Sequence, residues 1–187
     1  MTDSVVNRRR ARTLFALIAV SVLIVDVLTK IAAVAWLRPA EPVPVLGDLL
    51  RLYLIRNPGA AFSIGEGATW VFTILAVVVL AFLLIAVVPG LRHRGWAVGL
   101  GLVVAGISGN LGDRLFRTPG FARGHVVDFL QLPYWPIFNV ADMAVVFGAG
   151  TIVFCWLVKG VGHDGVLESE REDAKRVEQE AKETAGE

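Results

Sequence analysis

Four long apolar stretches, separated by polar segments, dominate the 187-residue chain; they run over residues 14–37, 69–88, 95–112 and 140–158. Each is close to the roughly 20 apolar residues that an α-helix needs to cross the hydrocarbon core of a bilayer. In lipid, backbone polar groups must be paired within the protein, so such stretches form helices. The pattern therefore predicts an all-α membrane protein, a four-transmembrane-helix bundle.

The segment between the first two stretches, residues 38–68, has a different pattern. Around Arg51 and Tyr53, the letters LLRLYLI show a short alternation, and Pro and Gly cluster on both sides. Alternation bounded by turn residues is typical of strands. We therefore expect a small β-hairpin or sheet at the membrane surface, between spans one and two.

The N-terminal region resembles a signal peptide, because basic residues precede LFALIAVSVLIV and the letters AVA follow. We expect it to be retained as the first span. The apolar stretch is long enough to cross the bilayer, and it contains Asp26 and Lys30, which a cleaved segment does not need.

Composition supports membrane insertion and adds a charge asymmetry. The chain is 55% hydrophobic and has a formal net charge of +1. Residues 168–187 are rich in acids and bases and almost free of apolar side chains, which predicts a solvated, partly helical or disordered tail. The single cysteine, Cys155, excludes an intramolecular disulfide and is expected to pack in an apolar span.

The distribution of Lys and Arg between the loops predicts the orientation. One side receives the dense cluster Arg8, Arg9, Arg10 and Arg12, and then Arg92, Arg94 and Lys159. The other side receives six arginines spread over two longer loops. We expect a basic cytoplasmic N-terminus (residues 1–13), a four-span domain (14–158) with the β element outside, and a charged cytoplasmic tail (159–187).

With this topology, the unusual polar residues converge at the outer end of the bundle, in the outer leaflet or just above it. Span three runs outward and span four runs inward, so the end of one lies beside the start of the other. The converging residues are Asp26, Lys30, Asn57, Asn110, Asp113, Arg114, Asp128, Asn139 and Asp142. In this interpretation Asn57 and Asp128 belong to external loops.

Several of these residues also have a purely structural interpretation. Asp26 and Lys30 are four apart and form an ion pair on one helix face. Asn110 bonds a neighbouring helix, and Asp113 and Arg114 cap a helix end or face lipid headgroups. Asn139 and Asp142 form a helix N-cap, where an acid in the first turn suits the helix dipole.

The pair Asp128 and Asp142 points to chemistry. Two carboxylates held close together do not both ionise, so one keeps a proton and they titrate as a unit. Such a pair takes a proton from water and gives one to a leaving amine, which is sufficient to hydrolyse a peptide bond without a metal or cofactor. Two further mechanisms stay open, a serine nucleophile (Ser63 with His125, or Ser108) and a divalent metal beside His125.

At these residues the chain resembles the lipoprotein signal peptidases, or signal peptidase II, of bacteria. The resemblance spans about residues 14 to 158 and rests on five pieces in family order. They are DVLTK at 26–30, NPGAAFS at 57–63, GNLGDRLF at 109–116, GHVVDF at 124–129 and FNVAD at 138–142. Each piece alone is weak, whereas the five together are highly specific.

The resemblance implies an aspartic endopeptidase that removes the signal peptides of prolipoproteins, cutting on the N-terminal side of a diacylglyceryl-modified cysteine. It implies Asp128 and Asp142 as the catalytic pair. The supporting and substrate-binding residues would be Asp26, Lys30, Asn57, Gly59, Ala60, Asn110, Asp113, Arg114, Asn139 and Ala141. No cofactor, metal or nucleic acid is expected; the partners would be prolipoproteins, membrane lipid and globomycin-type inhibitors, and the protein would be monomeric in the bacterial cytoplasmic (inner) membrane.

One segment and one residue depart from the family pattern. Two other classes of protein are alternatives to a peptidase. RTPGFAR at 117–123 lengthens one loop, and Val27 stands where glutamine is common. A small proton-coupled transporter also keeps acids inside a membrane, but it needs polar residues through the full depth, and spans two and four lack them. A structural scaffold leaves the clustered acids without a purpose.

Overall fold

The computed structural model describes residues 5–59 and 69–185. Its long helices are α1 (Arg8–Trp36), α2 (Thr69–Phe82), α3 (Arg94–Phe116) and α4 (Val140–Val153). They lie side by side as a bundle, and four helical segments are long and apolar enough to cross a membrane. The predicted four-helix membrane bundle is confirmed.

Two of the membrane helices change geometry before they end. The π-helical segment η2 (Leu83–Val87) and the 3₁₀ turn η3 (Val88–Gly90) continue α2, and the π-helical segment η4 (Phe154–Val158) continues α4. Pro89 accounts for the tight turn that ends the second span, because it supplies no backbone N–H to continue a helix. With these continuations the second and fourth spans cover Thr69–Gly90 and Val140–Val158.

Two helices extend beyond the predicted spans, one at its start and one at its end. α1 begins at Arg8 because the side chain of Asn7 accepts a hydrogen bond from Arg10 N at 2.8 Å and caps the helix. Hydropathy alone placed the start at residue 14. α3 continues to Phe116, so Asp113 and Arg114 lie inside its last turns.

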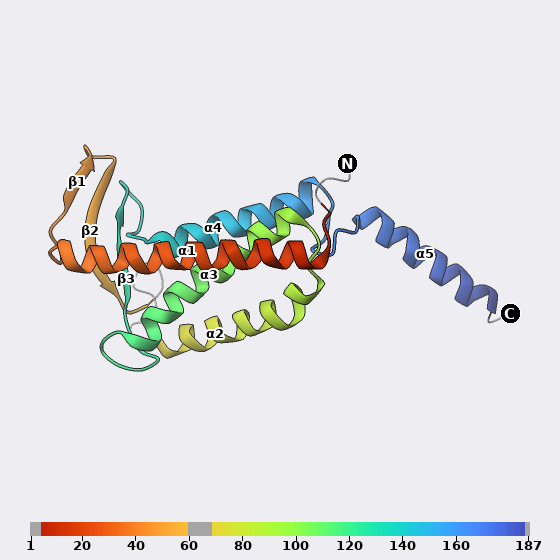
Figure 1. Ribbon diagram of the computed structural model, residues 1–187, viewed down its shortest axis with the longest axis horizontal. Helices are drawn as coiled ribbons and strands as arrows, with labels where there is room; N and C mark the ends of the chain where they lie inside the picture. Colours follow the sequence, from red (N-terminus) through yellow and green to blue (C-terminus); the bar gives the residue numbers. More distant parts are fainter. Residues whose placement is uncertain (1–4, 60–68, 186–187) are drawn as a thin grey trace.

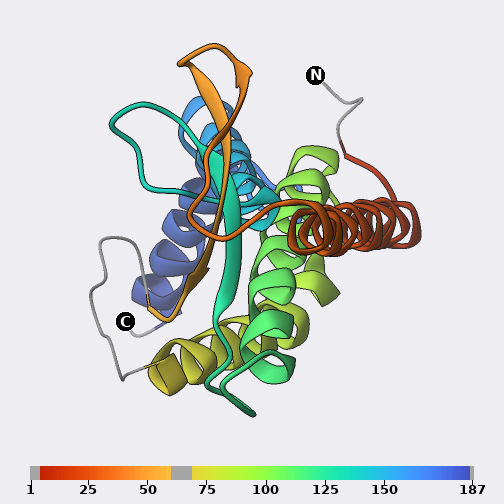
Figure 2. The same ribbon diagram turned by 90° about the vertical axis from the view of Figure 1, so that its left-hand side faces the viewer.

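A three-stranded antiparallel sheet covers one end of the bundle (Figure 2). Strands β1 (Val43–Leu46) and β2 (Leu50–Asn57) form the predicted hairpin, and β3 (Val126–Gln131) pairs with β2. The interpretation of Asp128 as a loop residue is wrong, because Asp128 lies on β3 opposite Ile55. β3 was missed because its pairing partner lies far away in the sequence.

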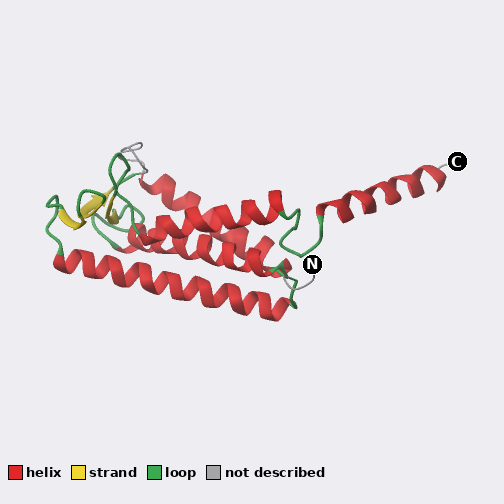
Figure 3. Ribbon diagram, turned by 90° about the horizontal axis from the view of Figure 1, so that it is seen from above, coloured by secondary structure: helices red, strands yellow, loops and turns green. Residues whose placement is uncertain are grey.

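Both described ends of the chain lie at the opposite end of the bundle from the sheet (Figure 1). Helix α5 (Glu168–Ala185) extends away from the other helices in two perpendicular views (Figures 1 and 3). Its sequence is dominated by charged residues, and its described side chains are exposed apart from the half-buried Arg171.

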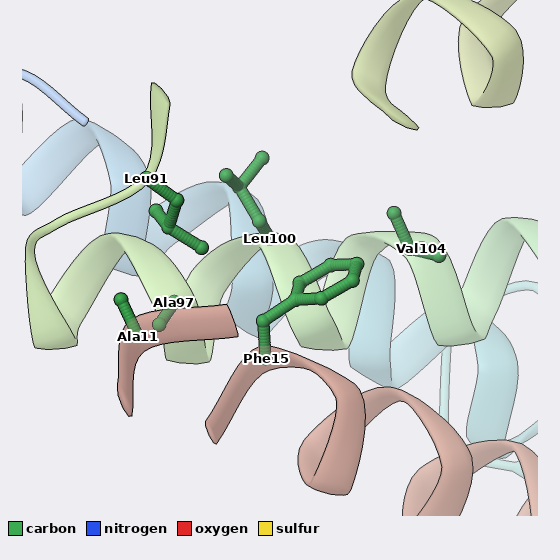
Figure 4. Close-up of a cluster of buried hydrophobic side chains, with 6 residues drawn as sticks. All are labelled: Ala11, Phe15, Leu91, Ala97, Leu100 and Val104. Carbon is green, nitrogen blue, oxygen red and sulfur yellow. The ribbon is translucent and has the colours of Figure 1, made fainter. Parts of the chain in front are cut away.

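The buried core has two parts. Near the termini, Phe15 of α1 packs with Leu100 and Val104 of α3, beside Ala11, Leu91 and Ala97 (Figure 4). Under the sheet, Ala33 of α1 packs with Leu54, Val127 and Phe129 of the strands. Many other large apolar side chains, among them Ile74, Leu75 and Val78 of α2, are exposed on the outside of the bundle, as expected of helices surrounded by lipid.

Small residues let α3 approach its neighbours closely. A Cβ atom added at Gly106 would collide with the carbonyl oxygen of Ala141 on α4, and one at Gly109 would collide with Asp26 Oδ2 on α1. Glycine at helix interfaces allows this close backbone packing in membranes. Gly106 and Gly109 therefore bring three helices together next to the polar end of the bundle.

We expect Gly106→Ala to destabilise the protein by about 1–3 kcal/mol, because the new methyl group must displace the backbone of α4. Gly112→Ala in the same helix is the matched control: nothing lies within 4 Å of its added Cβ. This control should leave stability unchanged or slightly higher, since alanine favours helix. Thermal unfolding in detergent or lipid measures both; equal melting temperatures for the two variants would contradict the packing argument.

Candidate functional site

The polar residues predicted to converge do meet, at the sheet end of the bundle. Five elements contribute: α1, the end of β2, the last turns of α3, β3, and the start of α4. They supply, in that order, Asp26 and Lys30; Asn57; Asn110, Asp113 and Arg114; Asp128; and Asn139 with Asp142. Each element arrives from a different part of the chain, so the site exists only in the folded bundle.

Asp128 is buried, with only 1% of the residue exposed, whereas Asp142 is partly exposed. The antiparallel pairing of β2 with β3 places Asn57 opposite Val126, within reach of this carboxylate. Asn57 Nδ2 donates to Asp128 Oδ2 at 2.9 Å, and Asn139 Nδ2 donates to Asp128 Oδ1 at 2.6 Å. Both oxygens are therefore bound by neutral amide donors.

Asp142 stands in the first turn of α4, where a reciprocal capping box fixes it. Asn139 Oδ1 accepts from Asp142 N at 3.0 Å, and Asp142 Oδ2 accepts from Asn139 N at 3.1 Å. The structural interpretation of this pair as a cap is confirmed. It occupies only one carboxylate oxygen, and Oδ1 of Asp142 points to Asn110.

Asn110 joins the two carboxylates into one network. Its Nδ2 donates to Asp142 Oδ1 at 2.8 Å, while its Oδ1 accepts from Asn139 Nδ2 at 3.2 Å. Asn139 in turn bonds Asp128, so two amides bridge the acids. Lys30 Nζ also donates to Asn110 Oδ1 at 2.9 Å, which fixes which way the amide of Asn110 faces.

Lys30 is buried at 1% exposure and lies between two acids. Its Nζ is 2.9 Å from Asp26 Oδ2, an ion pair whose angles do not meet hydrogen-bond geometry, and 3.0 Å from Asp113 Oδ2. The expected Asp26–Lys30 pair is thus present within a larger cluster. Asp113 is buried and neither caps a helix nor faces headgroups, which corrects that interpretation.

Arg114 extends toward the segment after β2. Its Nη2 donates to Gly59 O at 3.2 Å, and its guanidinium lies 5.4 Å from the ring centroid of Phe72. Gly59 N donates to Asn57 Oδ1 at 3.0 Å, so the same turn orients Asn57. Ala141 is fully buried in α4. Ala60 and Ser63 lie outside the residues that the structure describes.

Arg117 and Phe72 were not predicted. Arg117 pairs with Asp113 from the next helical turn, and an i, i+4 spacing of acid and base was the available signal. Phe72 gave no signal, because an aromatic residue in an apolar span is unremarkable in sequence. Over residues 5–59 and 69–185, Ser108 and His125 make no hydrogen bond to each other, and no group of three or more His, Cys, Asp or Glu side chains could hold a metal ion.

Burial raises the pKa of Asp128 to about 7. The hydrogen bond from Asn57 opposes this shift, the charge of Asp142 reinforces it, and Asn139 and Lys30 oppose it. The net result is a carboxyl group that still holds a proton in slightly acidic solution. Beside it stands Asp142, which is only partly buried.

Asp128 and Asp142 thus lie in one hydrogen-bonded network inside a membrane-helix bundle, and paired aspartates are the arrangement that aspartic peptidases use. The known proteins that the chain resembles agree with this class. Residues 18–158 match the family described as signal peptidase (SPase) II.

Named relatives extend the match over most of the chain. A lipoprotein signal peptidase of Leifsonia xyli is 47% identical over 83% of this chain and 71% of its own length. One of Rhodococcus jostii is 49% identical over 82% of this chain and 77% of its own length. One of Mycobacterium tuberculosis is 47% identical over 78% of this chain and 71% of its own length.

Two solved structures share the fold. Both are described as bacterial membrane enzymes determined by the in meso method, at 2.3 and 1.9 Å resolution. The match to the first has a TM-score of 0.71 at 27% identity and covers 86% of this chain and 94% of the solved chain. The second has a TM-score of 0.68 at 27% identity and covers 84% and 98%.

The chain belongs to the signal peptidase II family. It is a multi-pass bacterial membrane protein and an aspartic peptidase of the lipoprotein signal peptidase type, which processes the signal peptides of prolipoproteins.

The raised pKa of Asp128 gives a pH dependence of stability. Between the unfolded value of 3.8 and the folded value of about 7, the folded protein binds a proton that the unfolded chain has lost. The free energy of unfolding therefore falls as pH rises through this window. Asp128→Asn removes this contribution. The melting temperature of the variant minus that of the parent should therefore increase from pH 4 to 7, which thermal unfolding measures. Asp164→Asn, at the other end of the bundle, serves as the control. A constant difference between Asp128→Asn and the parent across this window contradicts the assignment.

Proposed function

We propose that Asp128 and Asp142 activate a water molecule to cut the peptide bond on the N-terminal side of a diacylglyceryl-modified cysteine in prolipoproteins. The observation that carries this proposal is the amide bridge. Asn139 donates to Asp128 Oδ1 at 2.6 Å, and Asn110 donates to Asp142 Oδ1 at 2.8 Å. Because the two amides also bond each other, both carboxylates belong to one rigid network.

The reaction follows from the different surroundings of the two acids. Asp128, the more buried, keeps the shared proton, while Asp142 serves as the base that takes a proton from water. The oxygen of that water adds to the peptide carbonyl, which accepts the proton from Asp128. When the carbon–nitrogen bond breaks, the proton on Asp142 passes to the leaving amine. One hydroxyl of the tetrahedral intermediate returns its proton to Asp128 as the carbonyl re-forms.

The neutral amides suit this exchange better than cations would. A lysine or arginine bonded directly to either acid would lower its pKa and drive off the proton that the reaction needs. Asn57, Asn110 and Asn139 supply donors without adding charge. Arg114 acts one step away by holding Gly59, and we assign Gly59, Ala60 and Ala141 to the walls of the site.

The orientation that we propose places both termini in the cytoplasm and the site near the extracytoplasmic face. The arginine cluster of residues 8–12, Arg92 and the start of α3 at Arg94 lie at the end opposite to the sheet (Figure 1), which supports this orientation. Exposed aromatic side chains at the sheet end, among them Trp36, Tyr134 and Trp135, suit a membrane interface. An acylated cysteine in the outer leaflet would then reach the two acids from the lipid.

A cavity of about 760 Å³ beside the sheet offers room for the substrate chain. It is lined by β2 and by the segment between β3 and α4, including Arg56, Asn57, Gln131 and Trp135. Asn57, which lines the cavity, also bonds Asp128, so one amide separates the cavity from this acid. We propose that the β1–β2 hairpin supports the exposed part of the substrate, that globomycin-type inhibitors enter the same cleft, and that a monomer is active.

Purified Asp128→Asn and Asp142→Asn proteins should cut a diacylglyceryl-modified prolipoprotein several orders of magnitude more slowly than the parent. Each variant removes an acid that exchanges protons with the reacting groups. Asp164→Asn is the matched control, because it makes the same change at the other end of the bundle. Near-parental cleavage by either folded site variant would rule out the carboxylate mechanism.

The hairpin is tested by replacing residues 43–48, which carry β1 and its turn, with a short Gly–Ser linker. Cleavage should fall by tenfold or more through a higher KM, because the substrate loses a supporting surface, whereas the helix bundle should keep its melting temperature. An unchanged KM at unchanged stability would show that the hairpin has no role in binding.

A further inference from the structure

The acids on either side of Lys30 each make a second contact, and both second contacts lead to the carboxylate pair. Asp26 Oδ1 accepts a hydrogen bond from Ala141 N at 2.9 Å. Asp113 Oδ2 accepts one from Val127 N at 3.1 Å. Ala141 directly precedes Asp142, and Val127 directly precedes Asp128. Each acid of the cluster therefore holds the backbone next to one acid of the pair.

Neither backbone group has an obvious partner within its own element. Ala141 N lies in the first turn of α4, where N–H groups have no intrahelical acceptor. Val127 belongs to β3, an edge strand of the sheet, and its N–H is bound by α3 instead of another strand. Planar peptide bonds transmit such anchoring to the next residue. Asp26 and Asp113 thus fix the backbone positions of Asp142 and Asp128, respectively.

Lys30 connects the two anchors. Its Nζ lies 2.9 Å from Asp26 and 3.0 Å from Asp113, and its third contact is Asn110 Oδ1 at 2.9 Å. Arg117 bonds the other oxygen of Asp113, so two cations balance two carboxylates. A buried ion pair often contributes little to stability. An isolated Asp26–Lys30 pair would neutralise α1 without Asp113 or the two backbone contacts.

We propose that Asp26, Lys30 and Asp113 form a clamp that sets the separation and orientation of Asp128 and Asp142. The proposal rests on the carboxylate mechanism above. The three are positioning residues: they touch the backbone beside the reacting acids and the amide between them, not the substrate. The clamp joins α1, α3, α4 and β3 at one lysine nitrogen, so a small shift of any one element changes the spacing of the pair.

The first test compares Lys30→Met with Thr29→Val, its matched control in the same turn of α1. Within residues 5–59 and 69–185, the Thr29 hydroxyl bonds only the carbonyl oxygens of Val25 and Asp26 in its own helix. For Lys30→Met we expect kcat per folded molecule to fall on the order of 100-fold, with KM within about threefold, since misplacing reacting groups by about 1 Å costs that much. Thr29→Val should keep both constants.

The second test uses milder changes at Asp113, because Lys30→Met leaves buried carboxylates without their cation. Asp113→Asn retains an oxygen that can accept from Val127 N and Lys30, and Arg117 can turn away because its side chain is 24% exposed. Asp113→Ala removes the acceptor. The clamp predicts that kcat of Asp113→Asn exceeds that of Asp113→Ala by at least tenfold. A role in charge balance alone predicts equal losses.

The outcomes separate the clamp from the mechanism on which it rests. If Asp128→Asn and Asp142→Asn abolish cleavage while folded Lys30→Met keeps kcat within threefold of the parent, the clamp is wrong and the mechanism stands. Equal kcat for Asp113→Asn and Asp113→Ala also overturns it. If the Asp128 and Asp142 variants themselves remain active, the mechanism fails first.

Discussion

A carboxylate beside a hydrocarbon layer must be neutralised or bonded, and this constraint shapes the whole sheet end of the protein. The protein satisfies this constraint in two ways, each at a different pair of acids. Asp26 and Asp113 are balanced by Lys30 and Arg117. Asp128 and Asp142 are bonded by asparagine amides, and none of the ion pairs among the described residues includes either acid. Charge is balanced where the fold needs rigidity, and left unbalanced at the two acids that we propose exchange protons.

The fold serves this division by bringing backbones unusually close. Glycines at positions 106 and 109 let α3 approach α4 and α1, so that Asn110 reaches both Lys30 and Asp142. The sheet completes the site from outside the bundle, because β2 delivers Asn57 and β3 delivers Asp128. The long apolar helices supply the frame, and the short polar ends of their neighbours supply the chemistry.

Hydropathy was enough to predict the four spans, because each needs only its own sequence to signal burial in lipid. The convergence of polar residues followed from topology, since alternating directions put the ends of spans three and four together. β3 could not be predicted in the same way: VVDFLQ is a short apolar run whose strand geometry comes from pairing with β2, about seventy residues earlier along the printed chain.

The contacts between individual side chains could not be predicted from the sequence either. Asp113 was placed at a helix end, yet the helix continues past it and turns its side chain inward to Lys30 and Val127 N. The partner of each asparagine depends on distances of a few tenths of an ångström between separate elements. Spacing rules describe neighbours on one helix, such as Asp26 with Lys30, but not which amide meets which acid across four elements.

The predominance of neutral amides around the two acids has a consequence for an enzyme whose site, in the orientation proposed above, faces the outer surface of the cell. Mobile ions screen exposed charges within about 8–10 Å at ordinary salt concentrations, but they do not enter a buried network. Asn57 and Asn139 hold Asp128 through dipoles in a water-poor setting, and the cluster's lysine is buried as well. The shape of the site is thereby insulated from the salinity of the surrounding medium, which a bacterium does not control.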